Sequence, residues 1–289
     1  MRTYRFLLVL VVLATNLSCR SGGEPALIQR TEARRLVSDM RINFAKASDA
    51  SNRAVMADTD EDSIKFAREA EAAIEAVSAA IPTLARHLSG LAYPGNADQL
   101  ARFQERFESY RTLDRKILKL AIENTNLKAQ HLLFGPISQA ANELCGALES
   151  LGSIVPAGPH RPLNDAAVRA QLAVREIQVL QAPHIAEARD PEMDRIEQQI
   201  ALRQAIVREG LLSIEKNGHP PMPALKAAKV SFEAFETLTS KLIALSRQNT
   251  NVRSLELAMR QKPTLTSACD AHLVSLQDAL AAQGFSGTR

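Results

Sequence analysis

The sequence has few aromatic residues. It contains no tryptophan, and Phe and Tyr together make up 4% of its 289 residues. The clusters of aromatic and β-branched residues that mark β-strands are missing, whereas the helix-favouring Ala, Leu, Arg, Gln and Glu are abundant. This composition excludes a sheet-based fold and predicts an all-α protein.

An excess of charge of one sign is also missing. The chain has 35 Lys and Arg against 32 Asp and Glu, and two of the basic residues, Arg2 and Arg5, belong to the N-terminal segment described below. The remaining 33 basic side chains nearly balance the acidic ones. We therefore do not expect nucleic acid as a partner, because its recognition needs a clear basic surplus.

The sequence lacks the motifs of common catalytic and metal sites. Its histidines include no Glu-x-x-His pair for a di-iron bundle, and there is neither a Cys-x-x-Cys-His haem motif nor a Gly-x-Ser-x-Gly elbow. Cys269 and His272 stand three residues apart on an expected helix, without further zinc ligands. We expect a protein that is not an enzyme and that has no metal and no cofactor.

Long hydrophobic runs are absent except for Phe6–Ala14 near the N-terminus. This run follows two arginines and is too short to span a bilayer, which is typical of a secretory signal. Cys19 lies just beyond it, so we expect a lipoprotein signal over residues 1–19, lipidation of Cys19 and a tether at 20–25. The expected location is the periplasmic face of a bacterial membrane. The alternative is ordinary cleavage nearby and a secreted periplasmic protein.

The most informative feature that is present is an internal repeat. Residues 107–132 align without gaps to residues 232–257, with ten identities in twenty-six positions at an offset of 125 that include the tripeptide Asn-Thr-Asn. A self-similarity at a fixed offset indicates a repeated structural unit.

Turn-forming residues divide the chain into two modules. Residues 156–162 hold three prolines in seven positions and cannot continue a helix, so we expect a linker there. We predict four helices in module 1, residues 26–155, and four in module 2, residues 163–285. The expected fold is two tandem antiparallel four-helix bundles with coiled-coil-like packing.

A heptad pattern runs along the repeated helix of module 1. We expect one buried row seven residues apart and a companion row three residues further on. The rows are Tyr110, Ile117, Asn124 and His131, and Leu113, Leu120, Leu127 and Phe134. We expect this helix to continue through Asn-Thr-Asn and to stop at Gly135-Pro136.

Both modules place a polar pair on this otherwise apolar stripe. The pairs are Asn124 with His131 and, in module 2, Asn249 with Glu256. One interpretation is a register device, since a buried asparagine fixes helix pairing at some cost in stability. Another makes Asn-Thr-Asn a helix end. The functional interpretation is a polar ligand pocket lined by these four residues.

Two further cysteines, Cys145 and Cys269, both lie on an expected fourth helix. An oxidising compartment would allow a disulfide between them if their Cα atoms come within about 7 Å. The alternative for Cys269 is a small residue of the core.

The stretches KILKLAIENTNLKAQHLLFG and KLIALSRQNTNVRSLELAMRQK carry a family resemblance. Each module resembles the extracytoplasmic four-helix-bundle sensor domain, of the HlyB-like kind, of methyl-accepting chemotaxis receptors. The resemblance implies small-ligand sensing outside the cytoplasm and carries over no ligand residues. The doubling departs from that family, and we expect this chain to lack the transmembrane relay and the cytoplasmic signalling parts of a receptor.

Together these patterns predict an exported, lipid-anchored sensory or solute-binding bundle protein without enzymatic activity. Its expected partners are the membrane through the N-terminal lipid, a small polar ligand, and a second copy or a membrane signalling protein. The alternative is a structural or scaffolding protein of the cell envelope that oligomerises through its helix faces.

Overall fold

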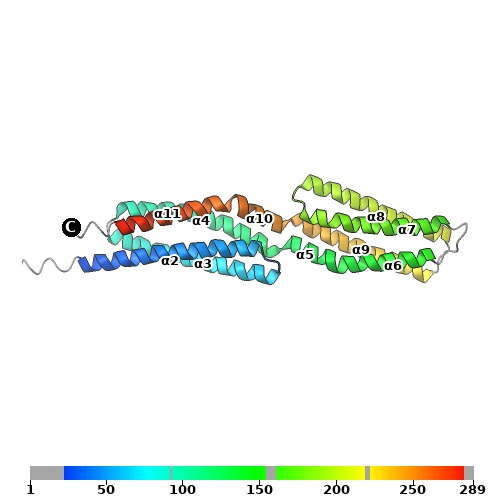
Figure 1. Cartoon of the computed structure of the whole chain (residues 1–289), viewed down its shortest axis with the longest axis horizontal. Helices are drawn as coiled ribbons and strands as arrows, with labels where there is room; N and C mark the ends of the chain where they lie inside the picture. The colour runs from blue at the N-terminus through cyan, green and yellow to red at the C-terminus, as the bar shows by residue number, and fades with distance from the viewer. Residues whose placement is uncertain (1–22, 92, 154–160, 219–221, 283–289) are drawn as a thin grey trace, which may run out of the picture. The chain divides into compact units, whose positions relative to one another are not determined.

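A computed structural model describes residues 23–91, 93–153, 161–218 and 222–282 (Figure 1). Within these ranges the secondary structure is helical, with no strand, which confirms the prediction of an all-α protein. Residues 1–22, including Cys19 and half of the expected tether, lie outside the described part of the chain, as do residues 156–160 of the expected linker. The other residues of the expected tether, 23–25, begin α2, and the last two of the expected linker, 161 and 162, begin α7.

The helices form two compact units. Unit 1 comprises residues 1–57, 61–118 and 256–289, and unit 2 comprises residues 58–60 and 119–255. The helices are α2 (Gly23–Val55), α3 (Asp60–Gly90), α4 (Pro94–Glu123), α5 (Thr125–Leu132), a π-helical turn η1 (Leu133–Ile137), α6 (Ser138–Ser153), α7 (Arg161–Ala186), α8 (Asp190–Gly218), α9 (Met222–Gln248), α10 (Thr250–Arg260) and α11 (Lys262–Ala282).

This division differs from the expected modules 26–155 and 163–285. α6, the last helix of the first repeat, contacts α7 and α9 in unit 2, and α11, the last helix of the second repeat, contacts α2 in unit 1. The reason is that neither chain segment turns back after the repeated helix. Each repeat therefore supplies three helices to one bundle and exchanges its fourth helix with the other repeat.

The apolar core of unit 1 comes from α2, α3, α4 and α11. Aromatic rings fill its centre: Phe44 lies edge-on to Tyr110, with ring centroids 4.8 Å apart, and Phe103 stacks on Phe107 at 5.2 Å. Such pairs contribute about 0.5–1.5 kcal/mol beyond the area they bury. Cys269, Leu273, Leu276 and Leu280 of α11 close this core. The exchanged fourth helix is thus an integral part of unit 1.

The apolar core of unit 2 has smaller side chains, many of them alanine, and one close helix contact. Ala166 and Ala170 of α7 face Gly210 of α8, where an added Cβ would lie 3.2 Å from both the Ala166 carbonyl oxygen and the Ala170 Cβ. This is tighter than an ordinary van der Waals contact, so a larger residue would require the neighbouring atoms to shift by a few tenths of an ångström. Val174, Ile177, Val207 and Leu211 continue the contact into the core.

The helix boundaries of the repeated segment differ from those expected. The helix does not end at Gly135-Pro136. Pro136 lies inside the π-helical turn η1, and the helix continues into α6. A π-helical turn accommodates the amide hydrogen bond that proline removes. The breaks lie instead at Asn124 and Asn249, which have φ of 48° and 55°.

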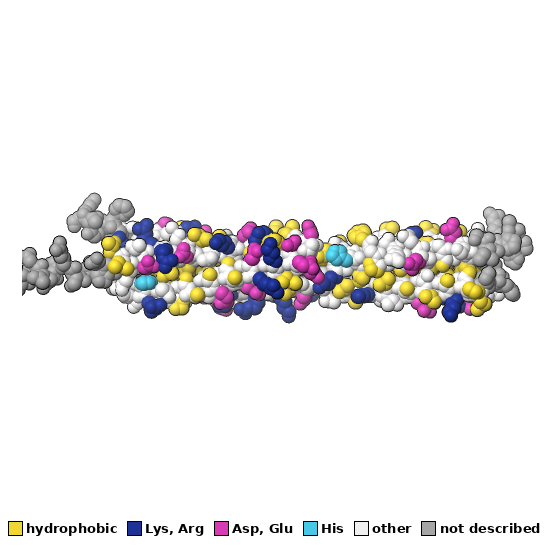
Figure 2. All heavy atoms as spheres, turned by 90° about the horizontal axis from the view of Figure 1, so that it is seen from below, with side chains coloured by type: hydrophobic (Ala, Val, Ile, Leu, Met, Phe, Trp, Pro, Cys, Tyr) yellow, Lys and Arg dark blue, Asp and Glu magenta, His cyan; other side chains and the backbone are white. Residues whose placement is uncertain are grey.

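Charged side chains of both signs are interspersed on the face that Figure 2 shows, in line with their near-equal numbers. Among the described residues, no helix combines the length and the apolar character that a membrane span requires.

Candidate functional site

The two Asn-Thr-Asn tripeptides interrupt their helices in the same way. Asn124 and Asn249 both adopt the left-handed conformation, which asparagine tolerates better than most residues because its short side chain can form local hydrogen bonds. α5 and α10 start at the next residue. The expectation of a continuous helix through Asn-Thr-Asn is therefore wrong, and the helix-end interpretation is correct.

The tripeptides bind each other through matching atoms. The amide of Thr125 donates to Oγ1 of Thr250 at 3.1 Å, and the amide of Thr250 donates to Oγ1 of Thr125 at 3.2 Å. Asn126 and Asn251 repeat this exchange through their side-chain oxygens, both at 3.2 Å. The repeat thus pairs with its own second copy. Each tripeptide caps the free amides at the start of the other's helix.

The side-chain amides complete this arrangement, which we call the Asn-Thr-Asn node (residues 124–126 and 249–251). Asn251 donates to Oδ1 of Asn124 at 2.8 Å, and Asn126 donates to Oδ1 of Asn249 at 2.9 Å. The side-chain amides also donate outside the node: Asn124 to the Asp60 carboxylate, Asn126 to the backbone oxygen of Ile185, and Asn249 to the backbone oxygen of Glu187. Asn124 and Asn249 are both buried, so their hydrogen-bonding groups are taken up within the protein.

The other two residues of the expected pocket lie elsewhere. His131 on α5 and Glu256 on α10 are exposed, and Glu256 pairs with Arg260 one turn further along, at 3.5 Å. The structure brings Asn124 and Asn249 into one network and does not bring His131 or Glu256 into it.

A second buried polar group in unit 2 connects three helices. Nδ1 of His184 on α7 lies 2.9 Å from the Ser246 hydroxyl on α9, and Nε2 lies 2.8 Å from the Glu197 carboxylate on α8. Arg247 donates to the same carboxylate at 2.5 Å. Burial would raise the pKa of Glu197, but the hydrogen bonds from Arg247 and His184 outweigh it and lower the pKa.

This serine–histidine–glutamate chain has the connectivity of an acyl-transfer triad. Its geometry does not suit that chemistry, because Ser246 is wholly buried and its hydroxyl donates to the backbone oxygen of His184 at 2.8 Å. The serine proton is thus directed away from the imidazole. The group is therefore a structural hydrogen-bond network that connects α7, α8 and α9.

Cys145 and Cys269 are free thiols, so the disulfide considered from the sequence is not formed. Cys145 lies in unit 2 and Cys269 in unit 1. Burial raises the pKa of both thiols, to about 12 for Cys269 in the core. Cys269 matches the alternative of a small core residue.

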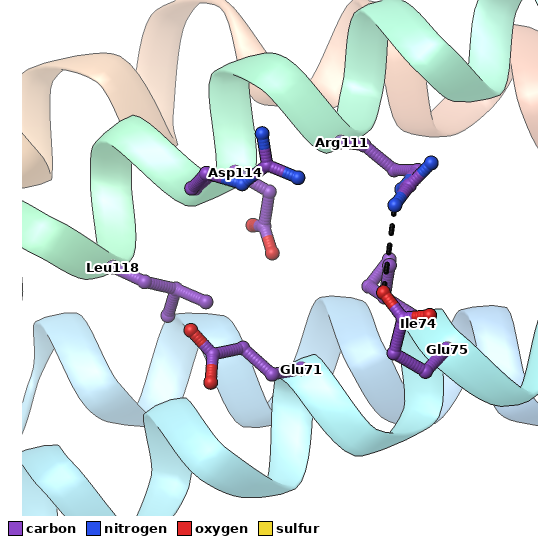
Figure 3. A pocket seen from close by; sticks show the side chains of 7 residues that line it. Glu71, Ile74, Glu75, Arg111, Asp114 and Leu118 are labelled. Carbon is purple, nitrogen blue, oxygen red and sulfur yellow. Dashed lines mark hydrogen bonds and ion pairs between the residues drawn. The ribbon is translucent and has the colours of Figure 1, made fainter.

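A cavity of about 250 Å³ lies in unit 1 between α3 and α4 (Figure 3). We call it the α3–α4 cavity. Ile74 and Leu118 give it an apolar wall, whereas Glu71, Glu75, Asp114, Arg111 and Arg115 give it charges of both signs. Arg111 is held by Glu75 at 3.4 Å and by Glu108 at 2.9 Å.

Asp114 forms the buried base of this cavity and is only 2% exposed. Its Oδ1 accepts from Ser51 at 2.6 Å and pairs with the Lys262 ammonium at 3.1 Å, in an ion pair whose side chains are each 3% exposed. Its Oδ2 takes part in none of the interactions of the described residues. In Figure 3 this carboxylate points into the space between the two helices, toward Glu71.

Other polar atoms around Asp114 also lack partners. The Tyr110 hydroxyl and the Arg111 Nε are buried without a hydrogen bond. Burial, and then the negative charge of Asp114, raise the pKa of Tyr110. Since buried polar atoms are nearly always satisfied, the unpaired Nε of Arg111, a residue that lines the cavity, suggests that a ligand or water completes it.

Lys262 connects this cluster to α2. Its ammonium also donates to the Ser48 carbonyl oxygen at 3.2 Å and to the Asn52 side chain at 3.1 Å. Burial lowers the pKa of Lys262, although the Asp114 charge opposes this effect. The described residues contain no group of three or more His, Cys, Asp or Glu side chains that could hold a metal ion.

The sequence interpretation missed Asp114 and Lys262. The buried row of α4 runs through Phe103, Phe107, Tyr110, Asp114, Ile117 and Ala121, whereas Leu113 and Leu120 of the expected companion row are only partly buried. The sequence signal that could have identified Asp114 as buried was its position in this row, whose members are spaced three and four residues apart. Lys262 precedes Pro263, so it had the pattern of an exposed helix start.

No family model matches the chain, and no curated protein matches it in sequence. Among solved structures, the chain is similar to the TorS sensor domain, seen in a TorS–TorT complex in the presence of TMAO. The two share 13% identity with a TM-score of 0.36, over 89% of this chain and 99% of that one.

Proposed function

We propose that this protein is an exported sensory or solute-binding protein that acts by binding a small polar molecule in the α3–α4 cavity. The observation that carries the proposal is Asp114, a buried carboxylate with one oxygen satisfied by Ser51 and Lys262 and the other directed into the cavity. The Arg111 Nε of the same lining is buried without a hydrogen bond, and a buried donor without a partner costs free energy that a bound ligand would recover. The sensor-like sequence pattern and the N-terminal signal are consistent with such a role.

The test is a thermal-shift screen of the purified chain against amino acids, organic acids and amines. A ligand of the cavity raises the melting temperature of the wild type, because it binds the folded state only. The shift should be lost in Arg115→Ala or Glu71→Gln, whose side chains line the cavity and have no partner within the described part of the chain. If no compound of any class produces a shift, the proposal fails.

Lipid anchoring at Cys19 is part of this proposal and rests on the N-terminal sequence. The anchor would hold the protein on the periplasmic face of a membrane, within reach of a signalling partner. Metabolic labelling with a radioactive fatty acid tests it. The wild type should incorporate label and Cys19→Ser should not; equal labelling of both proteins would refute lipidation at this residue.

A scaffolding function remains a second candidate, supported by exposed apolar residues on one face of α7. Val168, Leu172 and Val179 are 53%, 58% and 72% exposed and follow helical spacing on the side opposite the buried Ala170, Val174 and Ile177. A stable dimer in sedimentation that Leu172→Asp dissociates would favour this function. A monomer would exclude self-association as the role of this face.

A further inference from the structure

We propose that the α3–α4 cavity selects small organic ammonium compounds, a ligand class that deepens and rests on the proposed solute-binding function. The first reason is the balance of unsatisfied charge. Among the described residues Glu71 has no hydrogen-bond or ion-pair partner, and the contacts of Asp114 with Ser51 and Lys262 both use Oδ1. Both carboxylates line the same cavity (Figure 3), so an ammonium group bound there can donate charge-assisted hydrogen bonds to them.

The cationic side chains of the cavity are less available. The positive charge of Arg111 is countered by Glu75 and Glu108, which hold both of its terminal nitrogens. Arg115 is exposed at the edge, where water screens its charge. Glu71 is exposed in the same way, so its charge is screened as well. With the partners of the lining residues included, four carboxylates (Glu71, Glu75, Glu108 and Asp114) stand against three cations (Arg111, Arg115 and Lys262), and this excess favours a cation over an anion.

The apolar wall indicates an organic cation. Ile74 and Leu118 are 8% and 3% exposed and line the cavity beside the carboxylates. Methylene groups of a ligand would cover these side chains, at about 25 cal/mol per Å² of apolar surface removed from water. A hydrated metal ion gains nothing from such a wall.

The Arg111 Nε adds a requirement for an acceptor on the ligand. This N–H group is buried without a partner and belongs to a residue that lines the cavity. A hydroxyl oxygen at the other end of a short chain from the ammonium group would satisfy it. The volume of about 250 Å³ lies below the roughly 300–1,000 Å³ of sites for drug-sized ligands, so the molecule should be small.

Three probes of equal chain length separate the ligand classes. They are 4-aminobutan-1-ol, butane-1,4-diol and 4-hydroxybutanoate, which carry a positive, a neutral and a negative end. Calorimetric titration into the purified full chain should detect binding of the amino alcohol. The diol and the acid should bind at least about tenfold more weakly, because they lack the charge-assisted hydrogen bonds.

Glu71→Gln is the main test variant, because Glu71 is exposed and unpaired and its loss leaves folding unaffected. The substitution should weaken binding of the amino alcohol about 10- to 100-fold. Glu105→Gln is the matched control, since it removes the same charge from an exposed position of α4 outside the cavity. It should leave the affinity unchanged.

Two results would overturn the ligand class. One is tighter binding of 4-hydroxybutanoate that survives Glu71→Gln and is lost in Arg115→Ala; the cavity would then bind anions, and the solute-binding function would stand. The other is equal stabilisation by magnesium chloride, which would indicate a site for any cation. Absence of binding by all three probes also overturns the inference, whereas the solute-binding function fails only if the broad screen finds no ligand.

Discussion

The two copies of the repeated helix differ in the polar residues that they bury and in the charge that these residues carry. Tyr110 and Asp114 of unit 1 occupy the positions that Phe235 and Thr239 occupy in unit 2, at the repeat offset of 125. Thr239 accepts a hydrogen bond from Gln181 at 3.0 Å in a core without charge at this position. Asp114 carries a charge that Lys262 balances, and it reaches the α3–α4 cavity.

The rest of unit 2 extends this difference. In the Asn-Thr-Asn node each tripeptide satisfies the other, and in the His184 group the ring nitrogens and the Glu197 carboxylate all have partners. Both units also contain buried atoms without a hydrogen bond: Gln181 Oε1 in unit 2, and the Tyr110 hydroxyl and the Arg111 Nε in unit 1, where Arg111 lines the α3–α4 cavity. A closed polar network holds helices together, whereas an open one can receive a ligand. Burial of polar residues alone does not distinguish the two.

The largest expected effect comes from breaking the buried ion pair of unit 1. Lys262→Ala leaves the Asp114 charge buried without compensation and should cost about 3–5 kcal/mol of unfolding free energy. The control is Lys229→Ala, which breaks an ion pair with Glu215 whose side chains are 39% and 38% exposed, worth about 0–1 kcal/mol. Chemical denaturation measures both. Equal losses would show that Asp114 is not buried as described.

The second effect concerns the closed node of unit 2. Asn249→Ala places a side chain that disfavours φ of 55° at this position, at about 1–2 kcal/mol, and removes the acceptor of Asn126. The total loss should be about 2–4 kcal/mol. Asn249→Gly removes the same hydrogen bonds but tolerates the backbone conformation, so it should be the milder variant. An equal loss of unfolding free energy in Asn249→Gly and Asn249→Ala would argue against the left-handed conformation of residue 249.

A smaller and pH-dependent effect is expected at the His184 group. The pKa of Glu197 is lower in the folded protein than its ordinary 4.5, so its ionised form stabilises the fold above that value. This contribution is lost as the pH falls through the lowered pKa. Glu197→Gln should therefore cost about 1–2 kcal/mol at neutral pH, and the difference from wild type should shrink below pH 4.5. A difference that stays constant with pH would exclude this role.

The smallest effect compares one thiol from each unit. Cys269 is wholly buried and its pKa is raised to about 12, whereas Cys145 is partly buried. Because the thiolate is the reactive form, iodoacetamide should alkylate Cys145 first. Mass spectrometry of the digested protein measures the order. Faster labelling of Cys269 would contradict the packing of α11 into the core of unit 1.

Composition and periodicity were sufficient to predict the helical fold, because Ala-rich and Leu-rich segments with three-and-four spacing have few other stable arrangements. The exchange of the fourth helices could not be predicted this way. It depends on whether the chain turns or continues after the repeated helix, and Asn-Thr-Asn and Gly135-Pro136 each allow both. Asparagine broke the helix and proline did not, because long-range hydrogen bonds between the two tripeptides stabilise the left-handed residues.

The candidate site was less predictable than the fold. Asn124 and Asn249 were found from their place on an apolar stripe, but the partners that close their network come from α3 and from the segment after α7. Asp114 and Lys262 are 148 residues apart in the sequence and have no local pattern in common. Only tertiary packing brings their charges together, so pattern analysis of single helices could not pair them.

We propose that unit 1 binds a ligand at an open polar cluster, whereas the node of unit 2 is structural. Calorimetric titration of 4-aminobutan-1-ol into the wild type, Glu71→Gln and Asn249→Gly tests it most directly. The predicted result is an affinity reduced about 10- to 100-fold in Glu71→Gln and unchanged in Asn249→Gly. Binding that survives Glu71→Gln and disappears in Asn249→Gly would contradict it and place the ligand at the node.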